Sequence, residues 1–278
     1  LRPMQSKRLL GLSLALLCSV VLLRAQVFMR AFDPAPALSM GGANVAYPDP
    51  AAGLANEAAL VFQPRWGLWL GSALPYAVEG WTTASFQAYA GIDANSSAAI
   101  DIAHNGTSAY QEQRFRLQYA RRAGAKFAFG GSADLMRVSA QDYGSANAFS
   151  FGLAVLAQPV KNLWLGARVQ NPLQVKLGDD VLPATLRVGA AWRSSATLLW
   201  LLEAEKDLER PVQVRAGLEY RPLHSLFLRA GIRSAPGRMS LGAGFLLKNG
   251  LALHAAAEWH PVLGVTPAAG ISYTAASR

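Results

Sequence analysis

The sequence predicts an all-β protein, a closed antiparallel transmembrane β-barrel that follows an export signal. Three observations support this prediction. The chain is apolar, with 52% hydrophobic and only 15% charged residues. After Leu23 it nevertheless has no uncharged apolar stretch of about 18 residues, the length that a transmembrane helix needs. Several segments alternate between apolar and polar residues over about 9 to 11 positions, which is the length at which a tilted strand crosses a bilayer.

Residues 1–25 have the features of a secretory signal peptide. Lys7 and Arg8 end a basic region, an almost unbroken apolar run follows, and Ala25 offers a cleavage point. A membrane anchor is the alternative, and the run is short for one. The single cysteine, Cys18, lies in this signal and lacks the small preceding residue of a lipoprotein site. We therefore expect the exported chain to carry neither a lipid anchor nor a disulfide.

The formal net charge is +9 at pH 7, and four of the basic residues belong to the signal. The charge after cleavage is therefore +5. The basic residues that remain are spread singly along the chain rather than clustered in runs. This distribution argues against nucleic acid as a partner.

The alternation is clearest in residues 212–221, which read V-Q-V-R-A-G-L-E-Y-R, and it recurs in residues 186–193, 226–233 and 251–260. Successive side chains of a strand point to opposite faces, so each segment has an apolar and a polar side. A soluble β-sandwich would show the same alternation. The segment length and the arginine, glutamate and glycine on the polar sides favour a barrel with a filled lumen.

Tryptophans near the segment ends also favour a membrane barrel, because aromatic girdles mark both membrane interfaces. The expected girdle residues are Trp66, Trp81, Trp164, Trp192 and Trp259. Trp69 and Trp200 fit this girdle less well.

Counting the segments predicts about fourteen strands within a barrel of residues 63–278, an even number as in single-chain bacterial barrels. We expect tight turns at 124, 161–162 and 249–250, and longer polar connections at 142–147 and 174–183. The expected strands are 65–74, 80–90, 94–103, 112–122, 125–137, 147–158, 162–171, 184–194, 197–206, 211–221, 224–234, 238–248, 250–260 and 264–274.

Residues 26–62 do not alternate, and their prolines exclude a long strand. We interpret this segment as a plug folded into the lumen, since much of it is too apolar to remain in water. A mobile periplasmic extension is the alternative. The candidate plug residues are Gly41, Gly42 and Asn56.

Several motifs resemble the FadL-like outer-membrane barrels. Residues 39–46 (S-M-G-G-A-N-V-A) and 56–60 (N-E-A-A-L) are similar to that superfamily's N-terminal signature. Residues 182–189 (L-P-A-T-L-R-V-G), 217–222 (G-L-E-Y-R-P) and 260–264 (H-P-V-L-G) resemble its PorV/PorQ branch, which is associated with type IX secretion. The resemblance implies a barrel of fourteen strands with an N-terminal plug, located in the bacterial outer membrane. Glu57 departs from the usual proline, and the short chain implies trimmed extracellular loops.

Charged residues on the predicted inward faces are candidate lumen or ligand residues. One hypothesis is an ion-pair ladder that braces the wall, because unpaired charge is costly in a confined lumen. The other is a pocket for an amphiphile whose carboxylate is held by arginine. The candidates are Arg168, Arg187, Arg193, Arg215, Arg229, Arg233, Glu203, Glu205, Glu219 and Glu258.

Catalytic chemistry has weak support in the sequence. His254, His260 and Glu258 share a predicted inward face, but a zinc site needs three or four ligands. The sequence has neither an H-E-x-x-H nor a G-x-S-x-G motif. We therefore expect no catalytic residue, metal or cofactor, and no enzyme activity.

Two functions remain open. The resemblance favours a type IX secretion-associated component that binds a larger translocon barrel or a secreted cargo. The alternative is a FadL-like transporter of a hydrophobic small molecule, and a purely structural membrane protein is a third possibility. A lumen filled by paired charges would favour a protein partner, and an apolar pocket between plug and wall would favour a hydrophobic ligand. Outer-membrane lipid is an expected partner in every case.

Overall fold

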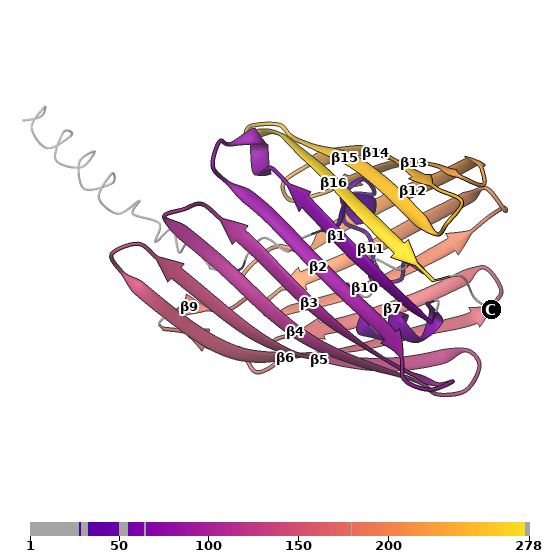
Figure 1. Ribbon diagram of the computed structural model, residues 1–278, viewed down its shortest axis with the longest axis horizontal. Coiled ribbons are helices and arrows are strands. Elements are labelled where there is room, and N and C mark those ends of the chain that lie inside the picture. Colours follow the sequence, from indigo (N-terminus) through magenta and orange to yellow (C-terminus); the bar gives the residue numbers. More distant parts are fainter. Residues whose placement is uncertain (1–27, 29–32, 50–54, 64, 179, 276–278) are drawn as a thin grey trace, which may run out of the picture.

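The computed structural model describes residues 28, 33–49, 55–63, 65–178 and 180–275, and its body is a closed antiparallel barrel of fourteen strands (Figure 1). Each wall strand pairs with the next along the chain, and β1 pairs with β16 to close the wall. Closure leaves no unpaired strand edge, as a sheet in lipid requires. The predicted fold class and strand number are confirmed. The expected signal peptide lies outside the described residues.

The wall strands occupy the positions that the alternation predicts. They are β1 (Trp66–Ala73), β2 (Thr82–Gly91), β3 (Ser96–Gly106), β4 (Tyr110–Arg122), β5 (Phe127–Ala140), β6 (Gly144–Val160), β7 (Leu163–Gln170), β10 (Thr185–Arg193), β11 (Leu198–Asp207), β12 (Gln213–Leu223), β13 (Leu226–Arg233), β14 (Arg238–Leu246), β15 (Leu251–His260) and β16 (Gly264–Thr274). The remaining elements are the strands β8 (Lys176–Leu177) and β9 (Asp180–Val181) and the helices α2 (Ala35–Leu38), η2 (Glu57–Phe62) and η3 (Pro75–Ala77). None of the described helices is long and apolar enough to cross a membrane.

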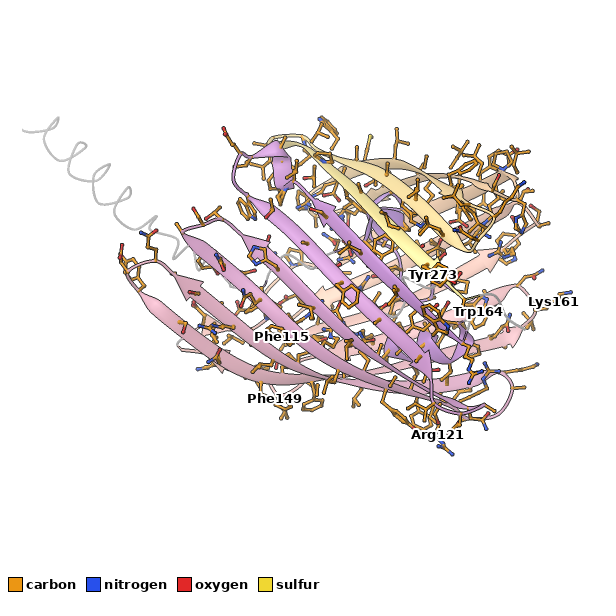
Figure 2. All side chains as sticks on the ribbon, in the orientation of Figure 1. Phe115, Arg121, Phe149, Lys161, Trp164 and Tyr273 are labelled. Carbon is orange, nitrogen blue, oxygen red and sulfur yellow. The ribbon has the colours of Figure 1, made fainter. Side chains whose placement is uncertain are left out.

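The wall is apolar outside and polar inside, which is the reverse of a soluble sandwich. In β12, Val214 and Tyr220 are exposed on the outer face, whereas Arg215 and Glu219 are buried on the inner face. Leucines, isoleucines, valines and aromatic residues cover the outer surface of the other strands in the same way. Figure 2 shows Phe115 and Phe149 on this outer surface. An apolar exterior around a closed barrel is what lipid requires.

Two connections differ from the expectation. The polar connection expected at 142–147 is mostly strand, because β6 begins at Gly144 and runs for 17 residues. The connection expected at 174–183 contains the β8–β9 hairpin. Strands β4, β5 and β6 are thus longer than predicted. The polar residues at their ends still pair along the ladder, which a pattern of apolar alternation does not report.

The two ends of the barrel differ in their connections. We call the end where β1 begins and β16 ends the proximal rim, and the opposite end the distal rim. The predicted turns at 124, 161–162 and 249–250 lie at the proximal rim. The two longest connections, 74–81 and 171–184, lie at the distal rim. Bacterial barrels have short turns on the periplasmic side, so we expect the proximal rim to face the periplasm.

The tryptophans divide between the two faces of the wall. Trp66, Trp192 and Trp259 are exposed on the outer face as expected, and Trp200 joins them because it lies opposite Trp192 in the ladder. Trp164 was expected in the girdle, but it shares the inner face of β7 with Gly166 and its ring packs against Phe62. Trp81 also departs from the girdle, since its Nε1 donates to Asn105 inside the wall at 2.9 Å. The buried Trp69 faces the lumen.

The described segments 33–49 and 55–63 lie inside the barrel, where α2 and η2 appear within the ring of strands (Figure 1). We call residues 33–49 and 55–63 the plug segment. Its side chains join two buried apolar clusters with the wall. Leu38 packs near Trp69 in one cluster, and Leu60 belongs to the other. The plug segment thus occupies the space that a hollow barrel of this size would leave to water.

Candidate functional site

Inward-facing glycines of the wall let the backbone of the plug segment approach closely. A Cβ atom on Gly166 would lie 2.2 Å from the Val45 carbonyl oxygen, and one on Gly231 would lie 2.1 Å from the Gly41 nitrogen. No side chain fits at these distances. The other wall glycines that contact the plug segment in this way are Gly130, Gly189, Gly217 and Gly242. The glycines on the polar faces of the strands thus leave room for the plug segment to pack against the wall.

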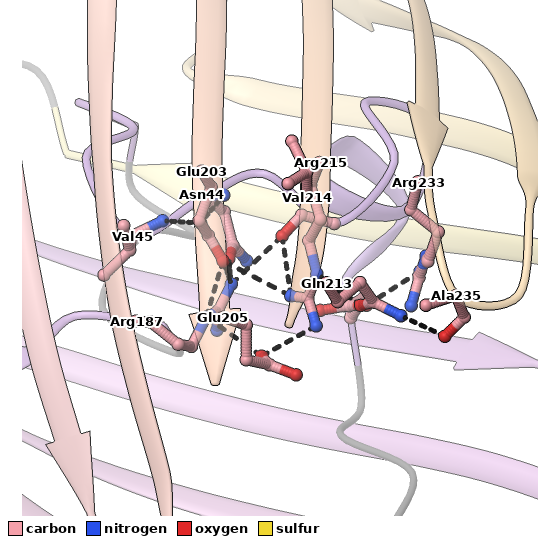
Figure 3. Close-up of polar contacts among 12 residues, drawn as sticks. Asn44, Val45, Arg187, Glu203, Glu205, Gln213, Val214, Arg215, Arg233 and Ala235 are labelled. Carbon is pink, nitrogen blue, oxygen red and sulfur yellow. Dashed lines mark hydrogen bonds and ion pairs between the residues drawn. The ribbon is translucent and has the colours of Figure 1, made fainter. Parts of the chain in front are cut away.

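Glu203 of β11 anchors the first half of the plug segment (Figure 3). Its Oε2 accepts the backbone N–H groups of Asn44 at 2.9 Å and Val45 at 2.8 Å. Its Oε1 accepts the Nε–H of Arg187 at 2.6 Å and lies 3.3 Å from Nη1 of Arg215. One buried carboxylate therefore holds both the plug backbone and two wall arginines.

The same two arginines also contact the plug directly. The carbonyl oxygen of Gly42 accepts from Arg187 at 3.0 Å and from Arg215 at 3.2 Å, and the side-chain oxygen of Asn44 accepts from Arg187 at 2.6 Å. Gly41 and Gly42 have φ values of +69° and +78°, a region that favours glycine. The Gly-Gly pair thus makes a bend whose carbonyl oxygen faces the arginines.

Glu219 of β12 forms a second anchor. It accepts the Tyr47 hydroxyl at 2.6 Å, the Nε–H of Arg229 at 2.8 Å and a guanidinium N–H of Arg221 at 2.7 Å. Both Tyr47 and Glu219 are fully buried. Hydrogen bonds from several charged or hydroxyl donors compensate a buried carboxylate for the loss of its water.

Glu57, which departs from the proline expected of the resembled family, begins η2 and pairs with Arg168. The guanidinium donates to both carboxylate oxygens, at 2.9 Å from Nε to Oε2 and 2.7 Å from Nη2 to Oε1. Arg116 lies 3.9 Å from the same carboxylate. A proline could form no such ion pair, so this departure adds a charged link between the second half of the plug and the wall.

Asn56 connects the two halves of the plug segment. Its side-chain oxygen caps η2 by accepting the Ala58 N–H at 3.0 Å. Its Nδ2 donates to the Val45 carbonyl at 2.7 Å and to the Val155 carbonyl of β6 at 3.1 Å. The predicted plug residues Gly41, Gly42 and Asn56 thus all make defined contacts.

The structure brings most of the other predicted lumen residues into ion pairs. Glu205 lies 2.7 Å from Arg215, and Glu258 lies 2.6 Å from Arg233 and 2.7 Å from Arg238. Arg193 is different: it ends β10 at the proximal rim, and no ion pair with another described residue is found for it. Its alternation placed it on the inward face, but the carboxylates lie nearer the middle of the wall.

The two histidines weighed for metal binding have separate partners. His254 contacts Arg229 at 3.3 Å and Ser272 at 3.1 Å. His260 accepts the backbone N–H of Leu263 at 3.1 Å. In the described part of the chain, no three metal-binding side chains gather.

A second group of buried charges was absent from the predicted site. Arg116 of β4 pairs with Asp134 of β5 and donates to Gln170 of β7 at 3.0 Å. Arg114 pairs with Asp101 of β3 at 2.9 Å. Asp101, Arg116 and Asp134 each lie between two apolar residues of a strand, so strict alternation in strands 94–103, 112–122 and 125–137 was the signal that could have identified them.

A cavity of about 340 Å³ remains above the plug segment, toward the distal rim. Phe28, Met136, Pro183, Pro211 and Ala235 form apolar parts of its lining. Charged residues of the strand ends complete it: Arg114, Arg116, Arg168, Arg187, Glu205, Asp207 and Arg210. The lumen therefore consists of a packed plug and a mixed apolar and polar chamber.

Solved structures with a similar fold include two toluene transporters and a FadL homologue. The Ralstonia pickettii toluene transporter TbuX has a TM-score of 0.69 and 13% identity, over 90% of this chain and 100% of that one. The Pseudomonas putida toluene transporter TodX has a TM-score of 0.69 and 14% identity, over 89% of this chain and 98% of that one. A Pseudomonas aeruginosa FadL homologue has a TM-score of 0.65 and 12% identity, over 90% of this chain and 99% of that one. No family model and no curated protein sequence matches the chain. At this identity the likeness shows the fold, which is that of FadL-like outer-membrane barrels.

Proposed function

We propose that this protein is an outer-membrane barrel that admits an uncharged hydrophobic small molecule through its distal rim, with the plug segment closing the lumen below. The observation that carries this proposal is the cavity of about 340 Å³ above the plug. Its volume lies in the range of small-ligand sites. The transporters that share the fold support transport of such a compound as the function class.

The lining of the cavity favours an uncharged ligand over a carboxylate. Arg168 and Arg187 already hold Glu57 and Glu203, and Arg114 already holds Asp101. An incoming carboxylate would have to displace a buried internal one, which is costly. Of the two hypotheses for the lumen arginines, these pairs support the bracing ladder.

The secretion-associated role stays a prediction from the sequence resemblance to the PorV/PorQ branch. The paired charges of the plug agree with a filled lumen, which we had associated with a protein partner. The same lumen keeps a chamber open above the plug, which a bracing plug alone does not require. We therefore place transport first.

Binding of toluene to the detergent-solubilised barrel, followed by NMR, tests the proposal. Thr185 lines the cavity, and its neighbour Leu186 is exposed on the outer face. We expect saturable binding to the wild type and to the control Leu186→Trp, and loss of binding in Thr185→Trp, because the indole ring fills the chamber. Binding that does not saturate, or that survives Thr185→Trp unchanged, would contradict the proposal.

A further inference from the structure

The proximal rim carries basic side chains with few acidic ones. Its exposed basic residues in the described part of the chain are Arg65, Arg121, Lys126, Lys161 and Lys248. Figure 2 shows Arg121 and Lys161 projecting from this end of the barrel. We call these five residues the basic ring. The exposed acidic residue of the described proximal turns is Asp93, which accepts the Asn95 backbone N–H at 2.7 Å.

The distal rim has no such bias. The exposed basic residues at or near it, Arg137, Lys176, Lys206 and Arg210, are matched by the exposed acidic residues Glu79, Asp142, Asp180 and Glu209. The basic ring is therefore not a consequence of the overall charge of the chain. It is a property of one end of the barrel.

The basic residues are distributed along the rim from Lys248 through Arg65 to Lys161, and the turns between β10 and β11 and between β12 and β13 carry no exposed lysine or arginine. Arg65 precedes β1, Arg121 ends β4, and Lys126 follows it in the next turn. Lys161 lies between β6 and β7, and Lys248 between β14 and β15, on the other side of the closure between β1 and β16.

Aromatic side chains of the outer face lie next to the basic ring. Trp66 follows Arg65, and Tyr119 lies two residues before Arg121 on the same outer face of β4. Tyr273, labelled in Figure 2, pairs with Trp66 in a ring contact at 5.0 Å. Aromatic residues occupy the headgroup level of a membrane, so the basic ring lies at or just beyond that level.

We propose that the basic ring binds the anionic headgroups of phospholipids in the leaflet at the proximal rim. Lysine and arginine beside a membrane surface attract anionic lipid, and salt screens the attraction. The proposal rests on the membrane placement of the barrel. It does not depend on which compound the cavity takes.

Spin-labelled lipids in vesicles that contain the reconstituted barrel test this inference. The measured quantity is the association of labelled phosphatidylglycerol with the protein boundary, relative to labelled phosphatidylcholine. We expect phosphatidylglycerol to be enriched several-fold at low salt and less at high salt. The triple variant Arg121→Gln/Lys126→Gln/Lys161→Gln should lose most of this enrichment.

The matched control removes three exposed charges toward the distal rim, Arg137→Gln/Lys176→Gln/Lys206→Gln, and should keep the enrichment. Equal association of both lipids with the wild type would overturn the proposal. So would an equal loss in the two triple variants, or a proximal variant that keeps its enrichment. Both variants should still bind toluene, so failure of this inference is distinguishable from failure of the proposed function.

Discussion

Strands β10–β12 and strands β1–β3 face the same lumen and treat their buried polar groups in opposite ways. On β10–β12, Glu203 and Glu219 each accept hydrogen bonds from the plug and from wall arginines. On β2, the amide group of Gln87 and the hydroxyl group of Ser85 are buried with no hydrogen-bond partner among the described residues. Among the described residues, strands β10–β12 therefore hold the plug segment by hydrogen bonds, and no hydrogen bond from β1–β3 to it is found.

This difference indicates what determines the position of the plug. Hydrogen bonds to buried carboxylates are directional and strong, so β10–β12 determine where residues 42–47 lie. A buried polar group without a partner costs about 1–3 kcal/mol, so side chains such as Gln87 on the opposite wall weaken the folded state rather than hold the plug. Four substitutions test this difference, and they follow in order of decreasing expected effect.

Glu203→Ala should have the largest effect. It leaves Arg187 and Arg215 without their shared carboxylate and frees two plug N–H groups, which should destabilise the fold by about 3–5 kcal/mol. Guanidinium unfolding measures the loss, and hydrogen exchange of residues 42–47 localises it. Glu205→Ala is the control, because Glu205 is partly exposed and its ion pairs are with Arg187 and Arg215 of the wall. Equal losses in the two variants would show that plug anchoring is not the cause.

Breaking the Glu57–Arg168 pair should come next. Arg168→Met leaves a buried carboxylate beside Arg116 alone, and about 3 kcal/mol is expected to be lost. The double variant Glu57→Met/Arg168→Met should recover much of that loss, because it removes both charges together. Unfolding midpoints of the single and double variants provide the test. A double variant less stable than Arg168→Met would mean that the pair stabilises through more than charge neutralisation.

Gly166→Ala should have an intermediate effect. The new methyl group would overlap the Val45 carbonyl, and overpacking of this kind costs about 1–3 kcal/mol. Faster hydrogen exchange in the plug segment is the expected sign. Gly131→Ala provides the comparison, since a Cβ there meets its nearest atom at 3.4 Å. Identical exchange in both variants would argue against the close fit of plug and wall.

Gln87→Met should have the smallest effect, within about 1 kcal/mol and stabilising if anything, because no hydrogen bond is lost. The matched change is Gln170→Met, which removes bonds to Arg116 and Asp134 and should destabilise. Thermal unfolding compares the two. A clear loss of stability in Gln87→Met would show that the β1–β3 wall holds the plug through bonds of its own.

The strand pattern and the lumen charges could be predicted because each depends on local alternation. The fourteen strands and the inward faces of Arg187, Arg215 and Glu203 follow from a period of two. Alternation also places Trp164 on the inner face with Arg168. The assignment of Trp164 to the girdle was wrong because it relied on the position of this residue near a strand end and not on alternation. Alternation predicts which face of the strand a residue lies on, but not its distance from the rim, so it could not predict that Arg193 lies at the end of β10, away from the lumen carboxylates.

The partners of the plug could not be predicted. The plug segment has no period, and its contacts join residues far apart in the chain, such as Tyr47 and Glu219. Glu57 was noted as a departure from a motif, but its partner Arg168 is 111 residues away. Only the closed barrel brings such residues together.

These separations have a consequence for how the protein is made. The plug segment is synthesised before the strands that hold it, because Asn44 and Val45 bond to Glu203, which lies 159 and 158 residues later in the chain. The plug can therefore dock only after β10–β12 are in place, and contacts of such long range form late in folding. Until then the lumen carboxylates and arginines are solvated by water. Biogenesis of this barrel should thus end when the plug segment docks and expels water from the lumen.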